Sequence, residues 1–449
     1  MESINRRGFL KKSAVTAAGL VVSAPAVRKG FAKDSPNERV NVAVVGIHGR
    51  GGGGPAGGIG HIREFSRVPN VRVATLCDVD ERLFPEKVAQ AEEASGFKPK
   101  TEVDFRKVLE DKDIDAVSIA TPEQWHALQT IWACQAGKDV YVEKPVSHTI
   151  NEGRKMVQAA RKYNRVVQTG TQRRSNKGTI EAIKFLHEGK LGKIYLSRGV
   201  EWSTRRSIGH KKDSPIPNGV HWDLFLGPAP YRPFNENRFL YNWHWFWDTG
   251  TAELGNSGIH TIDVQRWGMN KRVHPVKIHC TGGCYVWDSD QETPNVAFAT
   301  YEYEDGSILE FGVCNLPAGK VSIPRFYGSE GWMDERNNVF FGPKGEPGPS
   351  ISGGDAEQKK QQMKPGERGA DPHFVNFIDC VRSRKWQDLN AEIEEGHMST
   401  TLCHLGNISY RTGRKLIFNP YSEKFVNDDD ANSYLSKEYR YPYVVPDSV

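Results

Sequence analysis

A glycine-rich turn follows the first strongly apolar run of the chain. Residues 40–45 (Val-Asn-Val-Ala-Val-Val) are apolar and β-branched enough to form a buried parallel strand. Gly46, Gly49, Arg50 and Gly51 come directly after this run. A tight glycine turn at the end of such a strand lets backbone N–H groups approach a pyrophosphate. The spacing is not a plain G-x-G-x-x-G, so a glycine loop without a ligand is the alternative interpretation.

An acidic residue ends the second apolar run, residues 71–77. Asp78 at this position can accept hydrogen bonds from the ribose hydroxyls of an adenosine. Because a carboxylate repels a 2′-phosphate, Asp78 favours NAD over NADP, while Arg82 four residues later would soften that preference. Asp78 can also cap the helix that begins near Glu81, and the two roles are compatible.

Polar and turn residues also follow two further predicted strands, at 115–120 and 139–142. The carboxyl ends of parallel strands meet at one edge of a sheet, and this edge binds ligands. We therefore expect these residues to join the glycine turn and Asp78 around one cofactor; they are Thr121, Pro122, His126, Glu143 and Lys144.

The elements that carry these residues alternate between strand and helix from residue 39 to residue 170. This alternation predicts an α/β Rossmann domain, a doubly wound parallel sheet, over residues 38–170. After residue 190 the pattern changes to strands, at 193–202, 274–287, 296–303 and 308–313. We expect an α+β domain over residues 171–449 with a large open, mostly antiparallel sheet, one face of which packs helices while the other is free to form a homo-oligomer.

Several motifs resemble those of the Gfo/Idh/MocA family, which includes glucose–fructose oxidoreductase and inositol dehydrogenase. They are Glu143-Lys144-Pro145 about a hundred residues after the glycine turn, Thr121-Pro122 followed by Trp125-His126, Gly170-Thr-Gln-Arg-Arg174, and the segment 253–263. The resemblance spans roughly residues 39–415. It implies an enzyme, an NAD(P)-dependent oxidoreductase that acts on CH–OH groups.

The same resemblance implies catalytic roles for Lys144 and His260. Lys144 would lie near the nicotinamide and polarise the reacting hydroxyl, because a desolvated lysine has a lowered pKa. His260 would be the general base that takes the hydroxyl proton. Without the resemblance, an ion pair between Glu143 and Lys144 and a structural role for His260 are the simpler interpretations.

One position departs from the family pattern. Many dehydrogenases of the family have Asp four residues before the histidine, whereas this chain has Asn256. Residues four apart share a helix face, so we expect Asn256 beside His260 in the cleft. An amide can bind substrate but cannot carry charge or a proton. Asp263, three residues after His260, and Glu253 are the candidates to support the histidine.

The segment from Trp222 to Trp247 is rich in aromatic residues and prolines. Aromatic faces stack on sugar rings, although a loop that simply packs on the sheet is an equal alternative. We expect the carbohydrate substrate to be contacted by Gln172, Arg173, His244 and Trp245. His279, Cys280 and Cys284 have a metal-like spacing, but no second pair accompanies them, so we predict no metal site.

The first residues of the chain have the pattern of an export signal. Arg6-Arg7 precedes a weakly apolar stretch, residues 14–24, and a small-residue Ala24-Pro25-Ala26 site. This pattern resembles a twin-arginine signal, so we predict a signal and linker over residues 1–33, the twin-arginine machinery as a partner, and a periplasmic or otherwise exported protein. A basic terminus without such a function is the alternative.

Composition sets further limits. The chain has 449 residues, 38% of them hydrophobic and 26% charged, which is typical of soluble proteins of at least two domains. No run of 18 apolar residues exists, so we expect no stable membrane span. The net charge is +5, and without residues 1–26 about +2 remains, too little to indicate a nucleic-acid partner.

Three functional hypotheses follow. The first is an oxidoreductase of a sugar, sugar acid, polyol or glycoside with tightly bound, recycled NAD, or alternatively NADP, because an exported enzyme has no free cofactor pool. The second is a redox-neutral, NAD-dependent glycoside hydrolase or lyase that works through a 3-keto intermediate. The third is a non-catalytic binding protein that retains the cofactor, for which Asn256 is the one supporting feature.

Overall fold

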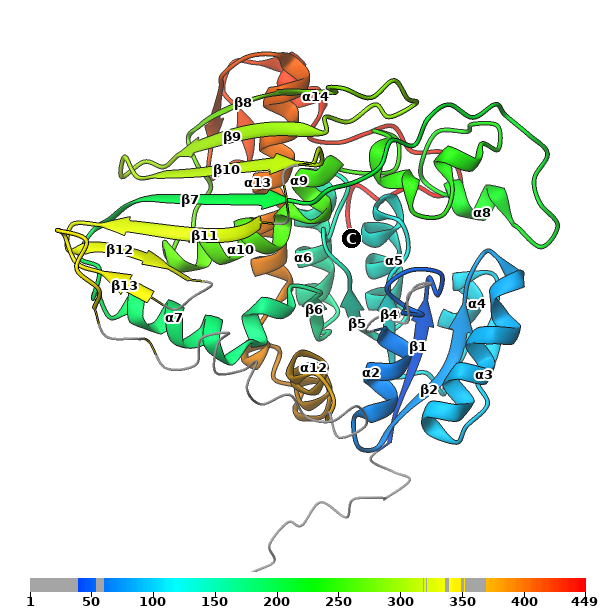
Figure 1. The fold of residues 1–449 in the computed structure, drawn as a ribbon. Helices are drawn as coiled ribbons and strands as arrows, with labels where there is room; N and C mark the ends of the chain where they lie inside the picture. The colour runs from blue at the N-terminus through cyan, green and yellow to red at the C-terminus, as the bar shows by residue number, and fades with distance from the viewer. Residues whose placement is uncertain are drawn as a thin grey trace, which may run out of the picture. The chain divides into compact units, whose positions relative to one another are not determined.

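The N-terminal strands are apolar along almost their whole length, as strands covered on both faces must be. β1 (Val40–Val45), β4 (Ala116–Ile119) and β5 (Asp139–Val142) are almost entirely buried. Together with β2 (Val71–Cys77), β3 (Lys100–Glu102) and β6 (Val167–Thr169) they form a parallel sheet in the order β3-β2-β1-β4-β5-β6 (Figure 1). This sheet confirms the predicted Rossmann fold.

The computed structural model describes residues 39–53, 60–317, 319, 321–335, 339–348, 351 and 369–449. The predicted signal and linker at residues 1–33 lie outside these ranges. Within them, no helix combines the length and apolar character that crossing a membrane requires.

Helices cover both faces of the parallel sheet. α2 (His61–Arg67) and α3 (Phe84–Ser95) contribute to one apolar layer, and α4 (Phe105–Glu110), α5 (Glu123–Gln135) and α6 (Ile150–Lys162) contribute to the other.

A helix from far along the chain completes the first of these layers. α12 (Pro372–Ser383) packs there, with the Phe374 ring stacked on Tyr141 at 4.8 Å between centroids. A segment assigned by sequence to the second domain therefore completes the core of the first.

The second sheet has nine strands in the order β13-β12-β11-β7-β10-β9-β8-β14-β15. Its strands are β7 (Ile194–Trp202), β8 (Lys277–Gly283), β9 (Val296–Glu302), β10 (Ile308–Cys314), β11 (Val321–Gly328), β12 (Gly331–Asp334), β13 (Val339–Phe341), β14 (Leu416–Asn419) and β15 (Lys424–Phe425). Among the described residues β7 and β10 pair in parallel and the other pairs are antiparallel, as the sequence predicts.

One face of this sheet carries helices. Buried and exposed residues alternate along β9, which is typical of a strand with one covered face. α10 (Gly258–Gly268) and α13 (Ile393–Thr412) supply the cover (Figure 1). β8 ends at Gly283, before the predicted residue 287, and Val286 further on has a positive φ of 70°, outside the strand region.

The remaining elements link the two sheets. α7 (Lys177–His187) leads into β7, and a long excursion between β7 and β8 carries α8 (Trp222–Leu226) and α9 (Ala252–Asn256). After β15 the chain forms α14 (Asp429–Ser433) and a tail that returns across α5 and α6 (Figure 1).

Candidate active site

The glycine turn after β1 is too tight for side chains. Gly46 has a φ of +83°, and a Cβ there would lie 2.5 Å from the Ala120 carbonyl oxygen. A Cβ on Gly51 would lie 2.1 Å from the Gly46 carbonyl oxygen, whereas a Cβ on Gly49 would meet open space. The close-packed glycines therefore leave backbone exposed to a cavity, as the approach of a pyrophosphate requires.

Asp78 is held at the same edge of the sheet by backbone donors. Its Oδ2 accepts the Ile47 N–H at 2.6 Å and its Oδ1 accepts the Asp80 N–H at 3.0 Å. Burial outweighs these bonds and raises the pKa of the carboxyl to about 6. Asp78 lines the cavity, so its carboxylate is available to ribose hydroxyls at neutral pH.

Arg82 is not free to attract a 2′-phosphate. Its Nε and Nη2 donate to the two oxygens of Asp80 at 2.6 and 2.7 Å. Asp80 is buried and lines the cavity beside Asp78. A bidentate carboxylate pair neutralises the guanidinium that the sequence offers as a softening influence on NAD preference.

Lys144 reaches from the end of β5 into the cavity. Its ammonium donates to the Asn256 carbonyl at 2.8 Å, and burial lowers its pKa against the opposing charges of Glu143 and Glu123. Asn256 turns its amide toward the Tyr241 hydroxyl at 3.2 Å.

Glu143 anchors the turn that carries Lys144. Its carboxylate accepts from His61 at 3.0 Å and from Gln172 at 3.3 Å. Burial opposes ionisation, but the His61 hydrogen bond and the charges of Arg50, His61 and Lys144 hold its pKa well below the usual range. Glu143 therefore lines the cavity as a carboxylate, and its hydrogen bonds hold the turn that carries Lys144.

His126 connects two of the strand-end turns. Its Nδ1 lies 2.7 Å from the Pro145 carbonyl oxygen and its Nε2 lies 2.8 Å from that of Thr121. Both ring nitrogens face carbonyl groups, so the His126 side chain holds the two turns in place. Thr121 and Pro122 of the first turn then line the cavity.

His260 is half-buried and lines the same cavity. Burial, followed by the nearby charge of Lys144, lowers its pKa to about 3, so the imidazole is neutral near pH 7. A neutral imidazole has a ring nitrogen that is free of a proton and can accept one from a hydroxyl.

The cavity has a volume of about 630 Å³ and brings most of the predicted site together. Its lining includes Gly46, Gly49, Arg50, Asp78, Thr121, Pro122, His126, Glu143, Lys144, Gln172, His244, Asn256 and His260. This set fits a dinucleotide, because it combines a glycine cradle, a ribose-binding carboxylate and a polar end with a lysine and a histidine.

Four predicted residues do not reach the cavity. Asp263 is buried and bonded to Arg174 at 2.8 Å and Ser399 at 2.6 Å, so it does not support His260. Arg173 pairs with Glu335. Gly51 packs under the turn, and Trp245 is buried beside the strand ends of the second sheet.

Aromatic side chains that the sequence predicts as sugar contacts line the same cavity as Asp78. Residues 216–245, called the strap below, cross from the second domain to the end of β2. The His221 N–H donates to the Val79 carbonyl at 2.8 Å, and the Trp125 indole donates to the Leu224 carbonyl at 2.9 Å. Lining residues from the strap and from α5 include Trp125, Trp132, Phe225, Phe239, Tyr241 and Trp243. The aromatic composition of 222–247 was the available signal, but it did not reveal that part of the segment covers the nucleotide side.

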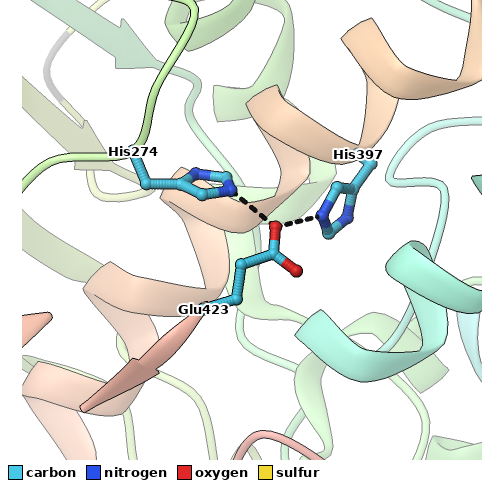
Figure 2. A group of neighbouring side chains, drawn as sticks. All are labelled: His274, His397 and Glu423. Carbon is cyan, nitrogen blue, oxygen red and sulfur yellow. Dashed lines mark hydrogen bonds and ion pairs between the residues drawn. The ribbon is translucent and has the colours of Figure 1, made fainter. Parts of the chain in front are cut away.

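Among the described residues, one group has ligand atoms close enough to share a metal ion: His274, His397 and Glu423. Figure 2 shows both imidazoles pointing to one carboxylate oxygen, each at 2.8 Å. Arg154 donates to the same carboxylate at 2.8 and 3.1 Å. A guanidinium that already neutralises the only carboxylate opposes a divalent cation, so we assign the group to an ion-pair clamp.

Comparison with known families gives two matches along the chain. A model described as "Oxidoreductase family, NAD-binding Rossmann fold" matches residues 40–171. A second, "Oxidoreductase family, C-terminal alpha/beta domain", matches residues 184–314 and 336–445. Together the two models match well over half of the chain.

Among curated proteins, glycosyl hydrolase family 109 protein 1 of Shewanella sp. (strain ANA-3) is 30% identical over 172 residues. The match covers 36% of this chain and 38% of that protein, so it spans less than half of the relative's length.

Two solved structures share the fold. The WlbA dehydrogenase of Bordetella pertussis, in complex with NADH and UDP-GlcNAcA, gives a TM-score of 0.62 at 19% identity and covers 85% of this chain and 98% of its own. Aldose-aldose oxidoreductase of Caulobacter crescentus, complexed with glycerol, gives a TM-score of 0.58 at 18% identity. The match covers 85% of this chain and 100% of that protein's chain.

Proposed function

Because the chain belongs to the Gfo/Idh/MocA family of oxidoreductases, we propose that it is an NAD-dependent enzyme that oxidises and reduces a hydroxyl carbon of a sugar, sugar acid, polyol or glycoside. The observation that carries the proposal is that Lys144, His260 and Asn256 line the same cavity as Asp78, whose strand β2 is separated from β5 by two strands of the sheet. When bound, NAD supplies hydride acceptance and return.

The chain's own residues then handle the proton and the substrate oxygen. The neutral His260 imidazole takes the hydroxyl proton, since it has no positive charge to lose first. The Lys144 ammonium stabilises the negative charge that develops on the oxygen. The Asn256 amide donates to substrate in place of the acid found in many family members, which orients the hydroxyl without competing for its proton.

We also propose that the cofactor stays bound between half-reactions. The strap lines the cavity beside Asp78 and the tail bonds to the strap, which favours retention over exchange. Export would make retention necessary, and we propose on the twin-arginine pattern of residues 1–33 that the protein is exported.

A second candidate is a redox-neutral glycosidase, and the family 109 glycosyl hydrolase relatives favour it. In this reaction the C3 hydroxyl is oxidised transiently, the ketone acidifies the neighbouring C–H, and the aglycone leaves by elimination. Water then adds and the ketone is reduced, so no net oxidation occurs. The same Lys144 and His260 serve both reactions.

The test begins with protein purified without added cofactor, whose nucleotide is released by denaturation and identified by mass and absorbance. We expect near-stoichiometric NAD or NADH. Protein without nucleotide that also fails to bind added NAD would contradict the proposal.

A panel of sugars, polyols and aryl glycosides then separates the two reactions. Reduction of the bound NAD by a free sugar supports the oxidoreductase, and aglycone release without net NADH supports the glycosidase. Lys144→Ala should lower either rate about 10²- to 10⁴-fold while leaving bound nucleotide in place. An unchanged rate would remove Lys144 from the mechanism.

A further inference from the structure

Glu123 is a carboxyl buried close to the cavity lining without a hydrogen-bond partner among the described residues, which makes its ionised form unfavourable. It is the first residue of α5, only 1% exposed, and directly follows the cavity-lining residues Thr121 and Pro122. Neither carboxylate oxygen has a partner at hydrogen-bond distance among the described residues. Thr251, just before α9, is a polar residue close enough to act on the carboxyl. Buried polar groups are almost always satisfied, so an exception of this kind calls for a functional explanation.

Two half-buried lysines carry charges that act on Glu123, and both are engaged elsewhere. Lys144 donates to the Asn256 carbonyl at 2.8 Å. Lys437, from the tail, lies 3.2 Å from a Glu152 oxygen and 2.9 Å from the His148 Nδ1. Within the described chain neither lysine forms an ion pair with Glu123, so the carboxyl feels their charge through a low-dielectric interior without direct contact.

α9 fixes the spacing between the acid and the catalytic lysine. Thr251 at the start of this short helix faces Glu123, and Asn256 at its end accepts from Lys144. Another titratable neighbour of Glu123 is the buried Cys403 thiol of α13. Burial raises the pKa of Glu123 to about 8, because the charges of the two lysines only partly offset the desolvation.

We propose that Glu123 is a positioning residue for Lys144: its carboxyl, buried behind the cavity without a counter-ion of its own, sets whether the Lys144 amine is protonated. An ionised Glu123 favours the ammonium that stabilises a substrate oxyanion, and a protonated Glu123 favours release of the Lys144 proton. The inference deepens the proposed function, because it matters only if Lys144 acts in the cleft.

The test measures the protonation of Lys144 directly, without substrate. The full chain is labelled with trace acetic anhydride between pH 6 and 11, and mass spectrometry of the Lys144 peptide reports the free amine at each pH. Removing a nearby negative charge destabilises the ammonium, so Glu123→Gln should move the Lys144 curve to lower pH by about one unit. Glu123→Asp should keep the curve near that of the wild type.

Glu152→Gln is the matched control, since Glu152 is equally buried but contacts Lys437 rather than Lys144. Its Lys144 curve should match the wild type. A curve that does not move in folded Glu123→Gln, or that moves equally in the control, would overturn the proposal. If Glu123→Gln does not fold, Thr251→Val serves instead, because loss of the facing hydroxyl should move the curve in the same direction.

The readout also separates this inference from the proposed function. Labelling needs no turnover, so protein that oxidises no sugar can still show the coupling, whereas an active enzyme can lack it. In an active enzyme, Glu123→Gln should shift the pH profile of bound-NAD reduction by the same amount as the labelling curve. A purely structural residue would lower the rate at all pH values without moving the profile.

Discussion

At the scale of single residues, Asp78 makes cofactor binding depend on pH. Its pKa of about 6 arises from burial, and the ionised form accepts hydrogen bonds from ribose hydroxyls more strongly than the protonated form does. NAD affinity should therefore be constant above pH 7 and fall as the pH drops through 6. Asp78→Asn should weaken binding about ten- to a hundredfold at pH 7.5 and abolish this pH dependence. Calorimetric titrations from pH 5 to 8 check both, and a wild-type affinity that is flat over this range would contradict the assignment.

Cofactor selectivity is a second property of single residues. Asp80 neutralises Arg82 with two hydrogen bonds, so Asp80→Asn should free the guanidinium for a 2′-phosphate. We expect the ratio of NADP to NAD affinity to rise about tenfold. The double variant Asp80→Asn/Arg82→Ala is the control and should lose the gain. Fluorescence titration with NADH and NADPH measures this affinity ratio. If the ratio stays raised in the double variant, Arg82 is not responsible for the gain.

At the scale of elements, the sequence predicts which strand ends meet at the site, but it does not predict the hydrogen-bond partners of side chains on helices. The ends of β1, β2, β4 and β5 meet at one edge because parallel strands must. Helical spacing placed Asp263 near His260, but its carboxylate is bonded to Arg174, 89 residues away, and to Ser399, 136 residues away. Such partners depend on tertiary packing, which periodicity does not encode.

The clamp of His274, His397 and Glu423 holds the hairpin of β14 and β15 against α13 and α6. Glu423→Gln leaves the Arg154 guanidinium with Glu394 as its one remaining carboxylate partner among the described residues and weakens both imidazole bonds, so the free energy of unfolding should fall by about 2–4 kcal/mol. Lys424→Ala, an exposed neighbour, should change little. Urea unfolding measures both variants. Equal stability of the Gln variant and the wild type would show that the clamp contributes nothing.

The same clamp predicts a direction for acid sensitivity. Burial opposes ionisation of Glu423, but hydrogen bonds from His274, His397 and Arg154 hold its pKa well below the usual 4.5. A carboxyl with a depressed folded-state pKa stabilises the protein above its unfolded pKa and loses this contribution as the pH falls. The stability difference between wild type and Glu423→Gln should therefore shrink below about pH 4.5. A difference that grows on acidification would contradict the assignment.

At the scale of the whole molecule, the tail joins the strap to the first domain. Arg440 donates to the Gly227 carbonyl at 3.0 Å and to the Asp223 carbonyl at 2.7 Å, and Tyr443 packs edge-on against Trp125 at 5.2 Å. The composition of residues 418–449, rich in Tyr, Pro and Asp, predicts an arm over the chain's own surface or over a partner subunit, and no local pattern distinguishes the two. Contacts between segments more than two hundred residues apart appear only in the folded chain.

Because the tail holds the strap in place, we expect the rate of cofactor dissociation to depend on the tail. The strap contributes the wall beside Asp78, and the Arg440 bonds fix the strap where it meets α5. In Arg440→Ala the strap should open more often, so the dissociation rate of NADH should rise about tenfold while the chemistry at Lys144 is unaffected. Arg414→Ala removes an exposed arginine that pairs with Asp428 and Asp430, away from the strap, and should leave the rate unchanged. Stopped-flow displacement of NADH fluorescence compares the three proteins. If Arg440→Ala releases NADH at the wild-type rate, retention depends on the glycine cradle and Asp78 alone, and the tail has no part in it.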